Sequence, residues 1–209
     1  MATTWIEEYR HQCHRAFTWR YARSTSQKIG LALVMAGLTG LMAQMRIPLA
    51  FTPVPITGQV FAVLLSGVLL GARYGAISQS IYAGLGVAGV PWFAGWSGGL
   101  AHFQGATGGY FIGFIAATAL IGWCTAKHSS WRGFRHQLAL MLAGVIIIYA
   151  CGATYLSMLI HADFSKILWL AISPFIFLDI GKAVIAAAIS ATILPRECPA
   201  GKELKEDIH

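Results

Sequence analysis

Apolar residues in this chain are gathered into long runs, and most polar residues lie in the stretches between them. A helix needs about 20 apolar residues to cross a bilayer, and fewer where the adjoining loops dip inward. The pattern predicts an all-α integral membrane protein with six transmembrane helices, at residues 29–45, 58–71, 75–90, 107–126, 138–160 and 167–194. Because only residues 72–74 separate the second and third runs, we expect these two helices to form a tight antiparallel pair.

The composition agrees with a membrane protein. Hydrophobic residues make up 56% of the chain and charged residues 11%, whereas a soluble domain carries roughly 25% charged residues. No linker divides the apolar region, so we expect one transmembrane domain at 29–195, between a basic cytoplasmic segment at 1–28 and a cytoplasmic tail at 196–209. Apolar residues recur every four positions from Trp5 to Tyr21, which favours an amphipathic helix on the membrane surface over a disordered leader.

Basic residues are unevenly divided between the two ends of the predicted bundle. If the N-terminus is cytoplasmic, twelve Lys and Arg residues lie on that side, Lys182 lies in the membrane, and only Arg46 and Lys166 lie outside. Cytoplasmic loops carry an excess of Lys and Arg. We therefore expect a multi-pass protein of the cytoplasmic membrane with both termini cytoplasmic. This topology also accounts for the net charge of +7 without a nucleic-acid partner.

The last apolar run contains two charged residues, Asp179 and Lys182. A charge at the centre of a spanning helix costs at least about 2.5–3.5 kcal/mol on insertion scales. The two residues are three positions apart, so they share one face of a helix. They are candidates for a ligand-binding site in the membrane; the alternative is a structural ion pair that ties this helix to its neighbours.

The loop after the first run is stiff and apolar. It contains Pro48, Pro53 and Pro55, and proline fixes φ and biases the residue before it toward extended backbone. An exposed apolar loop would be unfavourable, so we expect it to fold back as a lid, with Thr57 and Gln59 supplying polar atoms at the outer surface. The alternative is an ordinary helix connector.

The loop after the third run is rich in glycine and aromatic residues. Glycine permits close approach of the backbone to a ligand, here at Gly98 and Gly109 among others. Aromatic side chains offer flat walls for a ring or form an interfacial belt. Non-helical backbone at membrane depth is tolerated where it lines a cavity or is buried. The loop therefore predicts a pocket, with candidate wall residues Trp92, Phe93, Trp96 and Tyr110.

Small residues spaced four apart form ridges on several runs, which allow helices to approach closely. Such spacings occur at Gly67, Gly71 and Gly75, and at Gly105, Gly109 and Gly113. A third ridge consists of Ala32, Ala36 and Gly40. We expect these ridges to pack within the bundle, although one of them could instead face a partner protein.

Residues 95–99 match G-x-S-x-G and resemble the nucleophile motif of rhomboid intramembrane proteases, with Ser97 as the nucleophile. A serine nucleophile needs an adjacent base. The sixth run contains no histidine, and Asp179 would keep Lys182 protonated. The protease is therefore the weaker alternative to a solute-binding transport subunit. The chain has no Walker A sequence, so it would not hydrolyse ATP itself.

Several motifs, in the same order along the chain, resemble the BioY family, the biotin-binding S components of energy-coupling factor (ECF) transporters. They are residues 51–59 (FTPVPITGQ), 61–67 (FAVLLSG), 105–110 (GATGGY) and 174–182 (PFIFLDIGK). The resemblance implies a six-helix S-component fold and high-affinity capture of biotin from outside the cell. It also implies a transmembrane coupling protein and two ABC ATPases as partners, with docking at Ala32, Ala36 and Gly40. Membrane lipid is the remaining partner.

The resemblance also implies roles for individual residues in a protein without enzymatic activity, metal or cofactor. Asp179 would accept a ureido N–H of biotin, and Lys182 would donate to the ureido carbonyl or to the carboxylate. An S component for thiamin or riboflavin is the alternative within the same class. The remaining candidates for the binding site are Thr57, Gln59, Trp92, Phe93, Trp96, Ser97, Gly98, Gly109, Tyr110 and Tyr155.

Overall fold

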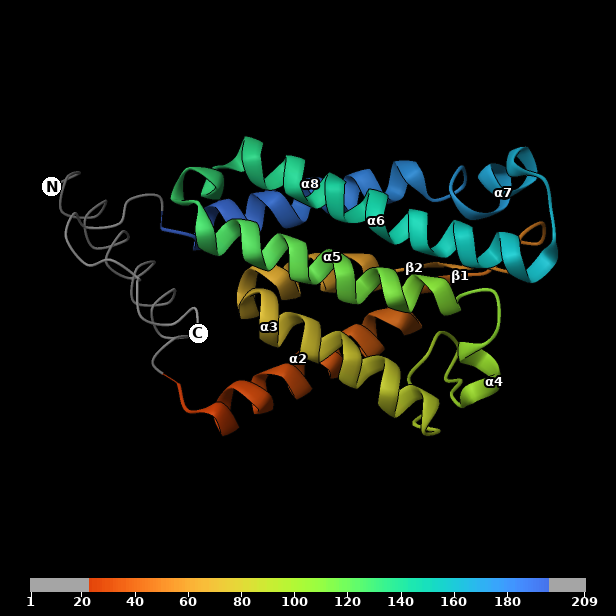
Figure 1. Cartoon of the computed structure of the whole chain (residues 1–209), viewed down its shortest axis with the longest axis horizontal. Helices are drawn as coiled ribbons and strands as arrows, with labels where there is room; N and C mark the ends of the chain where they lie inside the picture. The colour runs from red at the N-terminus through yellow and green to blue at the C-terminus, as the bar shows by residue number, and fades with distance from the viewer. Residues whose placement is uncertain (1–22, 196–209) are drawn as a thin grey trace, which may run out of the picture.

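The computed structural model describes residues 23–195 as a helical bundle with a short hairpin at one end (Figure 1). The predicted segment at 1–28 and the tail at 196–209 therefore lie almost wholly outside the described residues. The elements are α2 (Thr25–Gln44), β1 (Arg46–Ile47), β2 (Ile56–Thr57), α3 (Gln59–Val87), α4 (Leu100–Phe103), α5 (Gly108–Lys127), the 3-10 helix η1 (Ser129–Arg132), α6 (Phe134–Ile160), α7 (Phe164–Ala171) and α8 (Ile176–Ile193).

Five of the described helices are long and apolar enough to cross a membrane, namely α2, α3, α5, α6 and α8. Their bounds follow the predicted runs closely for α2, α5 and α6. The chain is therefore a mostly helical protein with several candidate spans, as the hydrophobic pattern predicts.

Helix α3 combines the second and third predicted helices and is folded sharply at Gly71. Gly71 has φ 76°, a value that glycine adopts at no steric cost. Gln59 Nε2 donates to Tyr82 Oη at 2.8 Å, and Gln79 Nε2 donates to Ser66 Oγ at 3.2 Å. A straight helix would separate Gln59 and Tyr82 by about 34 Å. The two halves of α3 therefore run back along each other, which confirms the predicted antiparallel pair.

The last predicted helix, at 167–194, is wrong in its first part. The structure has the short helix α7, then a break, and α8 begins only at Ile176. Pro174 lies in the break, and proline cannot donate to a helix and disfavours helical backbone in the residue before it. Asp179 consequently lies in the first turn of α8 and not at mid-span. The helix dipole favours a negative charge in this first turn.

Glycines allow the central helix α5 to pack closely against α3 and α6. A Cβ added to Gly67 would lie 2.8 Å from the carbonyl oxygen of Thr118, and one added to Gly113 would lie 2.7 Å from the Cα of Ile148. Neither position has room for a larger side chain. The ridges that contain Gly67 and Gly113 thus serve packing within the bundle, as expected.

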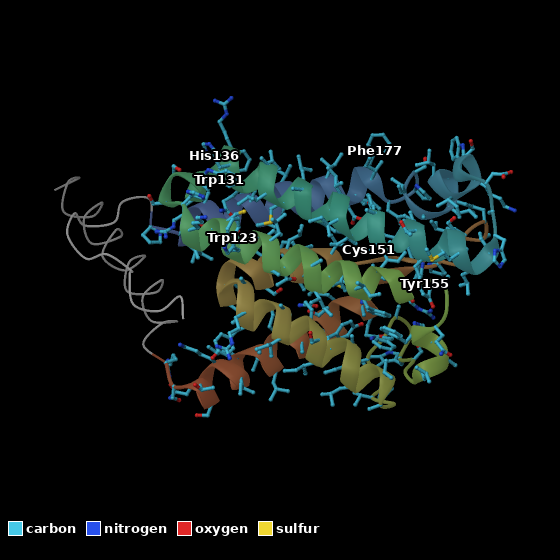
Figure 2. The ribbon with its side chains drawn as sticks, in the orientation of Figure 1. Trp123, Trp131, His136, Cys151, Tyr155 and Phe177 are labelled. Atoms are coloured by element: carbon cyan, nitrogen blue, oxygen red, sulfur yellow. The ribbon has the colours of Figure 1, made fainter. Side chains whose placement is uncertain are left out.

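The two ends of the bundle differ in charge. The described basic residues at one end are Arg23, Lys28, Arg73, Lys127, Arg132 and Arg135. Trp123 and Trp131 also lie toward that end (Figure 2), and Lys127 Nζ lies 4.6 Å from the ring centroid of Trp123. The hairpin, α4 and α7 lie together at the opposite end (Figure 1).

Candidate functional site

A cavity of about 440 Å³ lies at the end of the bundle that carries the hairpin. This volume is in the range of about 300–1,000 Å³ that small-molecule sites occupy. The lining comes from the β1–β2 hairpin, the start of α3, the loops around α4, the first turns of α5 and α8, and the middle of α6. Segments that are distant in sequence thus meet at one site.

A hydrogen-bonded group of charged and polar atoms lines one side of this cavity. Lys182 Nζ lies 2.6 Å from Asp179 Oδ1 and donates to the backbone oxygen of Thr57, also at 2.6 Å. Tyr149 Oη donates to Asp179 Oδ2 at 2.6 Å. Asp179 is 3% exposed, and a buried carboxylate is stable only when it is paired and hydrogen-bonded. Two of the three ammonium protons are used, so Lys182 has one donor left.

The amide of Gln59 forms a second polar group at the start of α3. Its oxygen accepts from Thr57 Oγ1 at 2.9 Å, and its nitrogen donates to Tyr82 Oη at 2.8 Å. One amide proton is left without a bond. Both Thr57 and Gln59 line the cavity, so this amide is held in a fixed orientation beside any bound molecule.

The loop that contains the hairpin folds over the cavity instead of extending into solvent. Thr52 Oγ1 donates to the backbone oxygen of Leu170 at 2.7 Å, which ties the loop to α7. Val54 is buried. Tyr110 Oη donates to the backbone oxygen of Ala171 at 2.9 Å, so α5 holds the same end of α7. The loop thus covers the cavity as a lid, as its apolar composition predicts.

Five of the predicted site residues line the cavity together. They come from β2, α3, α5 and α8, and they supply its charged pair, an amide, a hydroxyl and an aromatic wall. These residues are Thr57, Gln59, Tyr110, Asp179 and Lys182.

The other predicted residues do not line the cavity. Phe93 is completely buried and stacks on Phe111, with ring centroids 4.6 Å apart. Trp96 is 70% exposed and points elsewhere. The glycine-rich loop contributes small residues such as Ala94 and Gly105 to the lining, while the ring of Phe93 packs behind it against Phe111. The predicted residues that the cavity excludes are Trp92, Phe93, Trp96, Ser97, Gly98, Gly109 and Tyr155.

Gly109 and Tyr155 belong to the contact between α5 and α6. A Cβ added to Gly109 would lie 2.3 Å from the Cβ of Tyr155 and 2.5 Å from the backbone oxygen of Cys151. Figure 2 places Cys151 and Tyr155 along the same helix, α6. Tyr155 Oη donates to the backbone oxygen of Gln104 at 2.9 Å. Gly109 therefore packs against α6, and the hydroxyl of Tyr155 holds the loop next to the cavity.

The surroundings of Ser97 do not activate it as a nucleophile. Its hydroxyl donates to the backbone oxygen of Ala94 at 3.0 Å and lies 3.0 Å from Nδ1 of His102. The carbonyl oxygen of Ala94 competes with His102 Nδ1 for the single proton of this hydroxyl, and no described carboxylate is hydrogen-bonded to His102 to orient it as a base. Lys182, the other base considered, is bonded to Asp179 and Thr57. This geometry opposes the protease alternative.

Ala32, Ala36 and Gly40 face the interior of the bundle. Ala32 and Ala36 are completely buried, and a Cβ added to Gly40 would lie 3.0 Å from the Cβ of Trp92. The surface of α2 instead presents larger side chains such as Val34, which is 70% exposed. In this conformation the predicted docking ridge is a packing surface, and a partner protein cannot reach it without rearrangement.

Sequence reasoning missed four residues that contribute polar groups to the site or its lid. Tyr149, the hydrogen-bond donor to Asp179, lies in an apolar run with no neighbouring signal. In the sequence, Arg46 is visible only as a charge on the outer side, and His102 stands out by no motif. Thr52 stands inside the proline motif and could have been found from it. All four line the cavity.

The family model described as the BioY family matches residues 15–197. The chain is 39% identical to the probable biotin transporter BioY of Pyrococcus horikoshii, over 79% of this chain and 94% of the relative. It is 40% identical to the biotin transporter BioY of Thermotoga maritima, over 76% of this chain and 88% of the relative. The crystal structure of the S-component for biotin from an ECF-type ABC transporter is similar, with a TM-score of 0.73 at 29% identity, covering 81% of this chain and 93% of that one. The chain therefore belongs to the BioY family.

Proposed function

We propose that this protein binds biotin with high affinity and takes it up across the cytoplasmic membrane as the substrate-specific subunit of an ECF-type ABC transporter. The observation that carries the proposal is the covered cavity with the paired Asp179 and Lys182, in a chain of the BioY family. The similarity to a solved biotin S component supports the fold and the ligand together.

The polar groups of the cavity complement the ureido ring of biotin. That ring carries two N–H donors and a carbonyl acceptor. Asp179 accepts an N–H through a free lone pair, and the remaining proton of Lys182 is donated to the carbonyl. The apolar thioether ring packs against the aliphatic and aromatic wall formed by Val60, Phe114 and Phe175. The lid excludes water, which strengthens each polar contact.

The distribution of charge orients the protein in the membrane. The basic end carries most of the described Lys and Arg residues and faces the cytoplasm by the positive-inside rule. The cavity then opens to the outside, where biotin is captured, and both termini are cytoplasmic. The two antiparallel halves of α3 count as two of six transmembrane segments in this topology.

Active pumping of the ligand across the membrane needs an ATP-hydrolysing partner, because the chain has no Walker A sequence of its own. A transmembrane coupling protein and two ABC ATPases fulfil this requirement. Since the ridge at Ala32 and Ala36 is buried, the coupling protein meets the exposed side chains of α2 first.

Uptake of radiolabelled biotin by biotin-requiring cells tests the proposal. Cells that produce the full chain with coupling proteins are expected to accumulate biotin, and excess thiamin or riboflavin should not compete. The Asp179→Asn variant should lose uptake, whereas Ser97→Ala should keep it. Accumulation of thiamin or riboflavin instead would assign a different vitamin, and loss of function in Ser97→Ala alone would support serine chemistry.

A further inference from the structure

Arg46 differs from the other charged residues that line the cavity. Asp179 and Lys182 are bonded to each other and to neighbours. Arg46 also lines the cavity, yet no residue between 23 and 195 gives its guanidinium a hydrogen bond or an ion pair. It is exposed on β1, so it lies at the mouth. A guanidinium has five N–H donors in a planar fork, and here they are free for a ligand.

The side chain of Arg46 is nonetheless held in place. The guanidinium lies directly over Gly95, because a Cβ added there would be 2.4 Å from Nη1 and 2.5 Å from Cζ. Gly95 has φ 79°, a conformation that favours glycine. The backbone of Arg46 is paired with Thr57 in the hairpin, and the carbonyl of Thr57 accepts from Lys182. The fork is thus placed between the lid and the loop after α3.

Among residues 23–195, no carboxylate neutralises this cation. Between residues 23 and 195, Asp163 and Asp179 are the only acidic side chains. Asp179 is engaged by Tyr149 and Lys182, and Asp163 begins α7 and does not line the cavity. The mouth therefore carries an uncompensated positive charge next to a largely apolar cavity.

We propose that Arg46 binds the carboxylate of the ligand at the mouth of the cavity and selects for ligands with a free acid there. This inference rests on the proposed function and fixes the orientation of biotin, with its ureido ring at Asp179 and its carboxylate outward. The opposite orientation would place the ligand carboxylate beside Asp179 and Lys182, whose charges already neutralise each other, whereas the cation at Arg46 has no described counter-charge. Arginine matches a carboxylate with two parallel hydrogen bonds.

Titration of the purified full chain with biotin and with biotin carboxamide tests this assignment. The carboxamide keeps the rings and the chain of the ligand but removes its negative charge. Wild type is expected to bind biotin at least about tenfold more tightly than the carboxamide. In Arg46→Gln, the affinity for biotin should fall to that for the carboxamide, while the affinity for the carboxamide stays unchanged. That unchanged affinity also shows that the variant is folded.

Two further variants separate a direct contact from a general effect of charge. Lys166 is an exposed cation on α7 and does not line the cavity, so Lys166→Gln should keep the full preference for biotin. Arg46→Lys keeps the charge without the fork, and it should retain only part of the preference.

Three outcomes would overturn the inference. An intact preference in Arg46→Gln would move the carboxylate to another group, such as Lys182. An equal loss of affinity for biotin and the carboxamide in Arg46→Gln would exclude a direct contact between Arg46 and the carboxylate. A loss of the preference for biotin in Lys166→Gln as well would exclude it too. A wild type that binds neither ligand would instead refute the biotin assignment on which the inference rests.

Discussion

The ammonium of Lys182 and the backbone oxygen of Thr57 are 2.6 Å apart, which joins the first turns of α8 to the hairpin over the cavity. The same ammonium lies 2.6 Å from Asp179. One side chain therefore holds both the buried carboxylate and the lid. Any ligand that contacts Lys182 acts on a group that also fixes the position of the lid.

Removing Lys182 should loosen the lid as well as weaken binding. In Lys182→Ala, Asp179 loses its counter-charge and Thr57 loses its donor, so we expect biotin affinity to fall by about tenfold or more. Hydrogen exchange of residues 46–57 in the unliganded protein should become faster. Lys166→Ala, on exposed α7, should change neither. Wild-type exchange in folded Lys182→Ala would show that the lid does not depend on this bond.

The hydroxyl of Tyr149 should matter for binding through Asp179. Tyr149→Phe removes a hydrogen bond to a buried carboxylate, a contact typically worth about 1.5–3 kcal/mol. We expect a clear loss of biotin affinity and a lower melting temperature, measured by calorimetry and thermal unfolding. Tyr155→Phe on the same helix removes a bond to the backbone of Gln104, which does not line the cavity, and should lower the affinity much less. Equal effects of the two changes would contradict the role of Tyr149.

Gly109 should affect stability and not the ligand directly. In Gly109→Ala the new Cβ would overlap Tyr155 and Cys151, and overpacking of this kind costs about 1–3 kcal/mol. The melting temperature should fall, while the folded fraction keeps its affinity. Gly37→Ala is the control, because nothing lies within 4 Å of its added Cβ. Lost affinity at an unchanged melting temperature would place Gly109 at the ligand after all.

Acidification should destabilise the protein partly through His102. Burial lowers the pKa of His102 below its ordinary value of 6.5. As the pH falls below that value, the unfolded chain takes up this proton before the folded protein does, so stability decreases with falling pH and recovers as it rises. The fall in melting temperature between about pH 7.5 and about pH 5.5 should be smaller in His102→Gln than in wild type. His161→Gln, exposed after α6, should behave as wild type.

The sequence predicted the parts of this fold that hydrophobic patterning controls. Apolar runs located the long helices, and the brief break after Gly71 predicted the antiparallel halves of α3. The break at Pro174 was hidden because apolar residues continue on both sides of it. The hydrophobic pattern alone predicts one spanning helix for such a stretch, whereas backbone hydrogen bonding divides it into α7 and α8.

The parts of the site marked by a charge in an apolar run could be predicted from the sequence. The parts that depend on which side chains face the cavity in the folded protein could not. Asp179 and Lys182 are conspicuous by their cost in a membrane. Tyr149 and Tyr155 are the same residue type in the same apolar run, so the sequence does not distinguish them. They are six positions apart on a helix and therefore point in directions that differ by about 240°, so only one reaches Asp179. Phe93 and Trp96 share one loop, yet tertiary packing buries the first and exposes the second.

Calorimetric titration of biotin into the purified full chain, with Asp179→Asn alongside, tests the central claim most directly. We expect saturable one-site binding by wild type and an affinity lower by about tenfold or more in the variant. Absence of binding by folded wild type, or full affinity in folded Asp179→Asn, would contradict it.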